Sequence, residues 1–200
     1  MTSSLPTIAL DLRAHDPGSR PTFAVTVEDR ISEDHARSFY DLYLAAFGPL
    51  RTRAAARQVL HEQEFFGEMN DPRIAKYVAW NCSSEPVAMG TLTRNLEAIP
   101  WISPEYFVAR FPEQAARSAI YYLGYVLVHP SWRHHHLVQR LVEVALPPLI
   151  ESQAGVAFDV CSFNDDTLGF STRLASLLRD LTGAELERID TQNYYQVTFT

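Results

Sequence analysis

The apolar run from Ala119 to Val128, AIYYLGYVLV, constrains the fold of this chain more than any other feature of its sequence. Apart from Gly124, the run is aliphatic or aromatic at odd and at even positions, so a strand built from it is buried on both faces. Such a strand lies inside a layered α/β domain, with helices packed on both sides of its sheet. Pro130 ends the strand, because proline has no backbone N–H to donate to a neighbouring strand.

A helix is predicted directly after this strand. From Ser131 onward, apolar residues recur three or four positions apart, as they do on the buried side of a helix. We expect Pro147 and Pro148 to kink this helix or to restart it near its end. The residues predicted to be buried on it are Leu137, Val138, Leu141, Val142, Ala145 and Leu149.

The rest of the chain alternates between predicted strands and helices. Residues 96–117 are rich in proline and aromatic side chains and predict a long irregular loop, which can wall a binding site. Upstream, we expect strands at 7–12, 23–30, 73–81 and 87–94, the last two as an antiparallel hairpin, and helices from Ser32 to Gly48 and over 52–66. Downstream, we expect a strand at 156–163, a helix from Asn164 or Asp165 to Leu181, and final strands at 186–190 and 194–200.

Composition disfavours several classes of protein. The net charge is −7, and Lys76 is the only lysine, which we attribute to composition alone. Proteins that bind nucleic acid through bulk charge need clustered Lys and Arg. The two cysteines, Cys82 and Cys161, form neither a disulfide framework nor a metal-ligand spacing, which fits a reducing cytosol. The N-terminus lacks the features of a signal peptide, and no run approaches the roughly 20 apolar residues of a membrane span. We therefore expect a cytoplasmic protein.

An arginine and three histidines stand where the central strand ends and the helix begins. The first turn of a helix exposes unpaired N–H groups and carries the positive end of the helix dipole, so phosphates bind well there. Arg133 adds a forked set of donors, and His134, His135 and His136 tend to be protonated beside an anion. The sequence therefore predicts a phosphate-binding turn, with a solvated polar helix start as the alternative. No metal site is expected, because the histidines include no i, i+4 pair and no companion cysteine.

This strand–turn–helix segment resembles the coenzyme A-binding motif of the GNAT N-acetyltransferase superfamily. In that family, a strand ending in V-x-P leads into a pyrophosphate-binding turn, R/Q-x-x-G-x-G/A, which opens the next helix. The strand here ends in YVLVHP, and Arg133 matches the first position of the turn. His136 and Val138 replace the glycine and the small residue, so the motif is divergent. We expect side-chain cations to replace part of the close backbone approach that glycine allows.

The resemblance implies a fold and a donor site. The fold is an α/β (α+β layered) domain at 22–200, after an N-terminal extension at 1–21, with a mixed, mostly antiparallel sheet flanked by helices on both faces. The donor is acetyl-CoA or another acyl-CoA. Backbone N–H groups of Leu127 and Val128 would bind the pantetheine and polarise the thioester carbonyl. The pyrophosphate would contact Arg133, His134, His135, His136, Leu137 and Val138.

A second segment, CSFNDDTLGFST, resembles the family's strand–asparagine–helix unit, N-x-x-A-x-x-Φ-Y. The resemblance implies that Asn164 faces the acyl donor, with a plain helix cap as the alternative. Ser171 takes the place of the tyrosine that protonates the departing thiolate, and serine is a poor acid. Tyr122 or Tyr125 could supply the proton instead, unless both are core aromatics with satisfied hydroxyls.

The activity implied by the resemblance is transfer of an acyl group, chiefly acetyl, from acyl-CoA to an amine of a small molecule, by direct attack in a ternary complex. The loop around Trp101 and Tyr106 would wall the acceptor pocket. Two alternatives stay open: a GNAT-like transferase that uses another donor such as aminoacyl-tRNA, and a non-catalytic module that binds CoA or another ligand. The acidic net charge argues against a large RNA contact. No membrane partner is expected, and a homodimer is left open.

Overall fold

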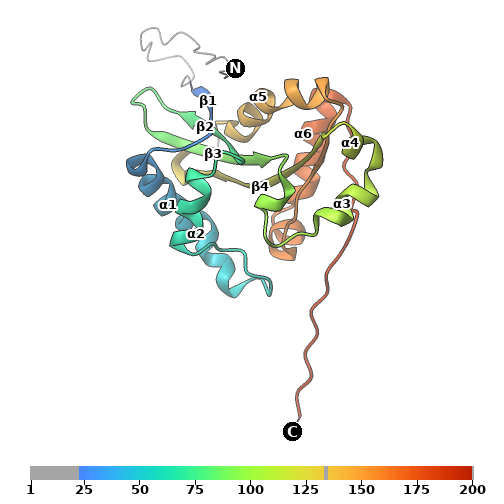
Figure 1. Ribbon diagram of the computed structural model, residues 1–200. Helices are drawn as coiled ribbons and strands as arrows, with labels where there is room; N and C mark the ends of the chain where they lie inside the picture. Colours follow the sequence, from blue (N-terminus) through green and yellow to red (C-terminus); the bar gives the residue numbers. More distant parts are fainter. Residues whose placement is uncertain (1–22, 133–134, 200) are drawn as a thin grey trace. The chain divides into compact units, whose positions relative to one another are not determined.

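The computed structural model describes residues 23–132 and 135–199, which form two compact units (Figure 1). The first unit contains 23–46 and 60–159, and the second contains 47–59 and 160–199. The predicted extension, the predicted strand at 7–12, and Arg133 and His134 lie outside the described residues. Among the residues that are described, no helix is long and apolar enough to cross a membrane.

One five-stranded sheet organises the first unit. Its spatial order, β1-β2-β3-β4-β5, follows the order of the chain. β1 to β4 pair antiparallel, and β5 runs parallel to β4. The predicted fold class, a mixed and mostly antiparallel sheet with helices on both faces, is confirmed. The strands are β1 (Ala24–Glu28), β2 (Ala75–Trp80), β3 (Pro86–Thr93), β4 (Ile120–Val128) and β5 (Gly155–Ala157).

Helices cover both faces of this sheet (Figure 1). On one face, α5 packs its buried Leu137 and Leu141 against an apolar cluster to which β1, β2, β3 and β4 all contribute. On the other face lie α1 and α2, where the ring centroids of Tyr43 and Phe65 are 5.1 Å apart. The helices of this unit are α1 (Glu33–Phe47), α2 (Glu62–Asn70), α3 (Pro104–Arg110), α4 (Pro112–Ala116) and α5 (Leu137–Glu151), with the 3₁₀ turns η2 (Leu96–Ala98) and η3 (Pro130–Trp132).

A bulge interrupts the pairing of the central strand β4. Gly90 pairs with Val126 and Leu92 pairs with Leu123, so one residue of β3 stands opposite two residues of β4. The single residue is Thr91, and the two opposite it include Gly124. The extra residue reverses the alternation of side chains along the strand. As a result, Leu123 before the bulge and Val126 after it both face the cluster under α5.

The helix α2 begins later than the sequence predicted. A helix was expected over 52–66, but the chain forms the 3₁₀ turn η1 (Gly48–Thr52) and regular helix resumes only at Glu62. A capping box fixes this start, in which the His61 N–H donates to the Glu64 carboxylate at 2.7 Å. Reciprocal capping satisfies N–H groups that the first turn leaves unpaired, so it defines where a helix begins.

Prolines account for two further differences from the sequence predictions. The predicted loop at 96–117 contains α3 and α4, whose first residues are Pro104 and Pro112. Proline is well suited to the first helical position, where its missing N–H has no partner in any case. The helix α5 also runs through Pro147 and Pro148 without a break, so the predicted restart is absent.

The strand β5 is shorter than the predicted strand at 156–163. It pairs with β4 only at 120–122. Beyond Ala157 the chain leaves the sheet. There the Asp159 carboxylate accepts hydrogen bonds from the side chains of Trp101 and Tyr122. The outer edge of β4 beyond Tyr122 therefore has no strand partner among the described residues of the sheet.

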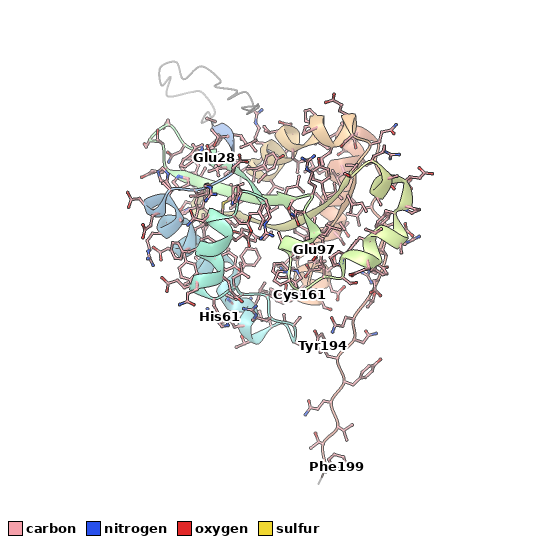
Figure 2. The ribbon with its side chains drawn as sticks, viewed as in Figure 1. Glu28, His61, Glu97, Cys161, Tyr194 and Phe199 are labelled. Carbon is pink, nitrogen blue, oxygen red and sulfur yellow. The ribbon has the colours of Figure 1, made fainter. Side chains whose placement is uncertain are left out.

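The second unit holds the helix α6 and an extended tail. The elements are η1, the π-helical turn η4 (Phe163–Thr167) and α6 (Phe170–Thr182). Gly183 ends α6 in the left-handed conformation, with φ of 73°. The strands predicted at 186–190 and 194–200 are absent from the described tail, because a strand must pair its backbone groups with a neighbour. Tyr194 and Phe199 lie on this tail (Figure 2), and Phe199 is 92% exposed.

Two glycine substitutions should have opposite effects on the free energy of unfolding, and the one at the bulge tests its geometry. A Cβ at Gly124 would lie 2.6 Å from the Thr91 hydroxyl oxygen, whereas a Cβ at Gly67, inside α2, meets nothing within 4 Å. We expect Gly124→Ala to lower the free energy of unfolding by about 1–3 kcal/mol, as overpacking does. Gly67→Ala should raise it by about 0.5–1 kcal/mol, because alanine favours helix. Urea unfolding of both variants measures this, and a Gly124→Ala variant as stable as the native protein would contradict the bulge.

Candidate functional site

Tyr122, a predicted proton donor, is bound to a carboxylate in the first unit. Its hydroxyl donates a hydrogen bond to Asp159, and the Trp101 indole N–H donates to the same oxygen at 3.3 Å. The Tyr122 side chain is 1% exposed and packs edge-on against Phe107. Burial, and then the hydrogen bond to Asp159, raise the pKa of Tyr122 well above its usual range. Tyr122 therefore keeps its proton at neutral pH.

Tyr125 lies at the bulge, on the face of the sheet that bears α1 and α2. Its ring centroid is 5.3 Å from that of Tyr43. Burial, and then the nearby Glu68 carboxyl, raise the pKa of Tyr125 well above its usual range. Neither tyrosine that the sequence singled out is thus a strong acid near neutral pH.

Leu127 and Val128 end β4, as predicted for the residues that would hold the pantetheine. They pair on one side with Met89 and Ala88 of β3. The other side of β4 at this level faces no strand among the described residues. Backbone N–H groups on such an edge are available to a ligand.

The start of α5 has the backbone geometry of an anion-binding turn. His136 stands directly before the helix in the left-handed region, with φ of 55° and ψ of 29°, and offers no side-chain cap. Leu137 and Val138 open the helix, and its first turn contains no acidic residue. Their N–H groups lack partners within the helix and carry the positive end of its dipole.

His135 is held by aromatic neighbours. Its ring centroid lies 5.1 Å from that of Trp132 and 5.8 Å from that of Phe23. The His135 backbone N–H donates to the Trp132 carbonyl at 3.1 Å. Arg133 and His134 fall outside the described residues, so their predicted contacts with phosphate stay predictions.

Asn164 and Ser171 belong to the second unit. Asn164 lies in η4, and Ser171 is the second residue of α6. The side chain that caps α6 is that of Asp165, which accepts the Ser171 backbone N–H at 3.2 Å and pairs with Arg188 at 3.1 Å. Asn164 is therefore not needed as the cap of α6, and its predicted role beside the donor stays a prediction, as does that of Ser171.

A carboxyl group that the sequence analysis missed lies beside the bulge. Glu68, on α2, places one carboxylate oxygen 4.0 Å from where a Cβ of Gly124 would be. The Thr91 hydroxyl lies in the same notch, and it has no well-aligned hydrogen-bond partner among the described residues. A glycine on β4 thus leaves room for a polar group that reaches in from a helix.

The chain's single lysine accompanies this carboxyl group. Lys76, on β2, is 0% exposed, and its ammonium donates to the backbone oxygens of Asp29 at 2.9 Å and Asp71 at 2.7 Å. Burial lowers the pKa of Lys76 to about 8, although Glu68 and other acids favour its charged form. A buried lysine needs such partners. A lysine inside an apolar strand was the one signal in the sequence that pointed to a buried carboxylate.

Burial raises the pKa of Glu68 to about 7, although the Thr91 hydroxyl and the Lys76 ammonium lower it. Near neutral pH, Glu68 therefore exchanges between its two protonation states.

The part of the chain that the structure describes contains no group of three or more His, Cys, Asp or Glu side chains that could hold a metal ion.

Comparison with known proteins gives a fold. No protein-family model matches the sequence, and a search of curated proteins finds no match. Among solved structures, aminoglycoside N-acetyltransferase AAC(6')-Iy in complex with CoA matches with a TM-score of 0.51 and 10% identity, over 88% of this chain and 97% of that chain. The chain has the GNAT fold.

Two further solved structures match with TM-scores just below that of AAC(6')-Iy. Aminoglycoside 6'-N-acetyltransferase AAC(6')-Ih from Acinetobacter baumannii matches with a TM-score of 0.49 and 12% identity, over 90% of this chain and all of that chain (100%). An acetyltransferase from Trypanosoma brucei matches with a TM-score of 0.49 and 16% identity, over 86% of this chain and 100% of that one. The resemblance seen in the sequence is confirmed for the fold.

The left-handed conformation of His136 predicts that glycine stabilises this position. A side chain costs about 1–2 kcal/mol there, and glycine avoids that cost. We expect His136→Gly to raise the free energy of unfolding by about 1 kcal/mol after its larger loss of chain entropy is subtracted. For a chain of this size, that is about 2–4 °C in Tm. His136→Ala keeps the Cβ and should bring no gain; equal stabilisation by both substitutions would contradict the assignment.

Glu68 also predicts how stability depends on pH. Its pKa is about 7 in the folded protein against an ordinary value of 4.5, so the folded state binds more protons between these values. Its contribution to the free energy of unfolding should therefore fall as pH rises from 4.5 to 7, and should level off above 7. Glu68→Gln should remove this slope in urea unfolding measured at several pH values. Parallel curves for the two proteins would show that Glu68 titrates normally.

Proposed function

We propose that this chain is an acyltransferase that moves an acetyl or related acyl group from acyl-CoA to an amine of a small molecule, by direct attack in a ternary complex. The observation that carries the proposal is the course of β4. The strand is bulged at Gly124, keeps an edge that has no strand partner among the described residues, and is followed by the left-handed His136, whose side chain makes no capping hydrogen bond to α5. AAC(6')-Iy, which shares the fold, was solved with CoA, and this supports CoA as the donor.

The donor would bind along β4 and at the start of α5. Coenzyme A would present its acyl group as a thioester, whose carbonyl carbon the amine attacks. The backbone at Leu127 and Val128 would bind the pantetheine, and the N–H group that points to the edge of β4 away from β3 would polarise that carbonyl. The pyrophosphate would meet the N–H groups of Leu137 and Val138, together with the side chains of Arg133, His134 and His136.

The acceptor site would include the aromatic residues before α3 and in it. Trp101 is 45% exposed and Tyr106 is 37% exposed, so both offer apolar surface to a ligand. The Asp159 carboxylate, held by Tyr122 and Trp101, would attract a cationic amine. The net charge of −7 supports a small cationic acceptor over RNA.

The departing thiolate would take its proton from water. The raised pKa values of Tyr122 and Tyr125 make both phenols weak acids, and the Ser171 hydroxyl is also a poor acid. Orientation of the amine against the thioester would supply much of the rate. We propose the cytoplasm as the location, which the two free cysteines, Cys82 and Cys161, support.

Acetyl-CoA should stabilise this protein against heat. A ligand that binds only the folded state raises the free energy of unfolding by about 2.7 kcal/mol at 100 times its Kd. Differential scanning fluorimetry with acetyl-CoA should show a higher Tm, and Arg133→Ala should reduce the shift by removing a charged phosphate contact. The matched control is Arg140→Ala on α5, where the side chain pairs with Glu143 at 3.4 Å.

The second half of the test is turnover. Release of free CoA thiol, followed with a thiol reagent across a panel of small amines, should depend on both acetyl-CoA and amine. Binding without turnover on any amine would leave a CoA-binding module. No stabilisation by millimolar acetyl-CoA, or equal shifts in the native and Arg133→Ala proteins, would contradict the donor site.

A further inference from the structure

The proposed donor site leaves one polar group beside β4 without a role. Glu68 and Thr91 meet at the bulge, on the face that bears α1 and α2. Thr91 is 1% exposed, yet its hydroxyl has no well-aligned partner among the described residues. Buried hydroxyls in folded proteins are almost always satisfied, so an exception calls for an explanation.

The geometry places this carboxyl group next to the strand that would hold the thioester. A Cβ at Gly124 would be 2.6 Å from the Thr91 oxygen and 4.0 Å from a Glu68 carboxylate oxygen. No side chain of β4 therefore stands between Glu68 and the backbone at position 124. Glu68 as a residue is partly exposed, although its carboxyl group is largely buried.

We propose that Glu68 takes the proton of the acceptor ammonium, and that Thr91, whose hydroxyl lies in the same notch, is a positioning residue for the Glu68 carboxyl group. This inference rests on the proposed function, and it assigns a base to the acceptor amine, a role that the protonated tyrosines of β4 cannot fill. Glu68 would be a catalytic residue contributed by a helix, while the strand that would hold the thioester contributes only a glycine at that point.

The chemical step balances with no further reactant. An alkylammonium ion has no free electron pair, so it first gives one proton to the Glu68 carboxylate. The neutral nitrogen then forms a bond to the thioester carbon, and the bond from that carbon to sulfur breaks. The second amine proton passes to the departing thiolate through water, and Glu68 returns its proton to solvent before the next cycle.

The charged groups around Glu68 suit the transfer of a proton to and from its carboxyl group. Lys76 faces it from β2 and favours the carboxylate, whereas Asp71, at the end of α2, favours the neutral acid. Tyr125 faces it from β4 and stays protonated. Asp71 is itself engaged by Arg73, which donates to it at 2.9 Å. The balance leaves a carboxyl group with a pKa of about 7, close to the value at which a general base works best at neutral pH.

Steady-state kinetics of three variants test the assignment. Glu68→Gln keeps the shape and removes the base, so kcat/KM for the amine should fall by at least about 100-fold, since general base catalysis is worth about 10²–10⁴. The KM for acetyl-CoA should stay within about threefold, because Glu68 makes no donor contact. The control, Glu62→Gln, changes an exposed glutamate of the same helix that pairs with Arg37, and should keep native rates.

The third variant tests the positioning role of Thr91. Thr91→Val removes the hydroxyl that lowers the pKa of Glu68, so the pH at which the rate reaches half its maximum should move upward. Thr91→Ser retains a hydroxyl and should restore the native profile. A merely structural hydroxyl would change stability in Thr91→Val without moving the pH profile, and that result would overturn the positioning role.

A readout independent of turnover completes the test. With glutamate labelled at its side-chain carboxyl carbon, ¹³C NMR should show one resonance, absent from Glu68→Gln, that titrates near pH 7; a midpoint near 4.5 would overturn the inference. A native protein that neither binds acetyl-CoA nor turns over an amine would overturn the proposed function, and this inference with it. Native turnover that Glu68→Gln retains within tenfold would overturn the inference alone.

Discussion

The bulge in β4 is the constraint on which the rest of the first unit depends. Thr91 of β3 stands opposite two residues of β4, so the strand gains a residue that its neighbour lacks. Side chains along a strand alternate between the two faces of its sheet. The extra residue therefore reverses the face to which each later side chain of β4 points. Val126 can then join the apolar cluster under α5, while Tyr125 and Leu127 turn toward α1 and α2. The same insertion bends the strand and leaves the notch at Gly124 that Glu68 enters.

Charge is buried at this notch at a cost in stability. Lys76 is fully enclosed and is satisfied by two backbone carbonyls, while Glu68 lacks a comparable set of donors. Replacing a buried ion pair with apolar side chains is often neutral or stabilising. A domain selected for stability alone would therefore gain from a leucine and a methionine here. A buried carboxyl group with a raised pKa next to β4 is consistent with the proposed proton transfer.

Periodicity in the sequence predicted β4, the hairpin of β2 and β3, and α5, because each has a regular and strongly apolar pattern. It could not predict the bulge, which depends on how β3 and β4 align in space. Glu68 was missed for the same reason: it flanks the apolar positions Phe65 and Met69 of α2, and only the packing of that helix turns it toward β4. The C-terminal strands were wrong because alternation shows that a segment can pair, and cannot show that a partner strand is present.

A strand edge, a helix start and a carboxyl group together form the proposed acyl-transfer site. In this site the donor lies along β4 and ends at the first turn of α5. A crystal structure of the protein with bound CoA tests this most directly. The account predicts pyrophosphate oxygens within hydrogen-bond distance of the Leu137 and Val138 N–H groups, and the pantetheine along the edge of β4 near Leu127. CoA bound away from both elements, with the start of α5 facing only solvent, would contradict it.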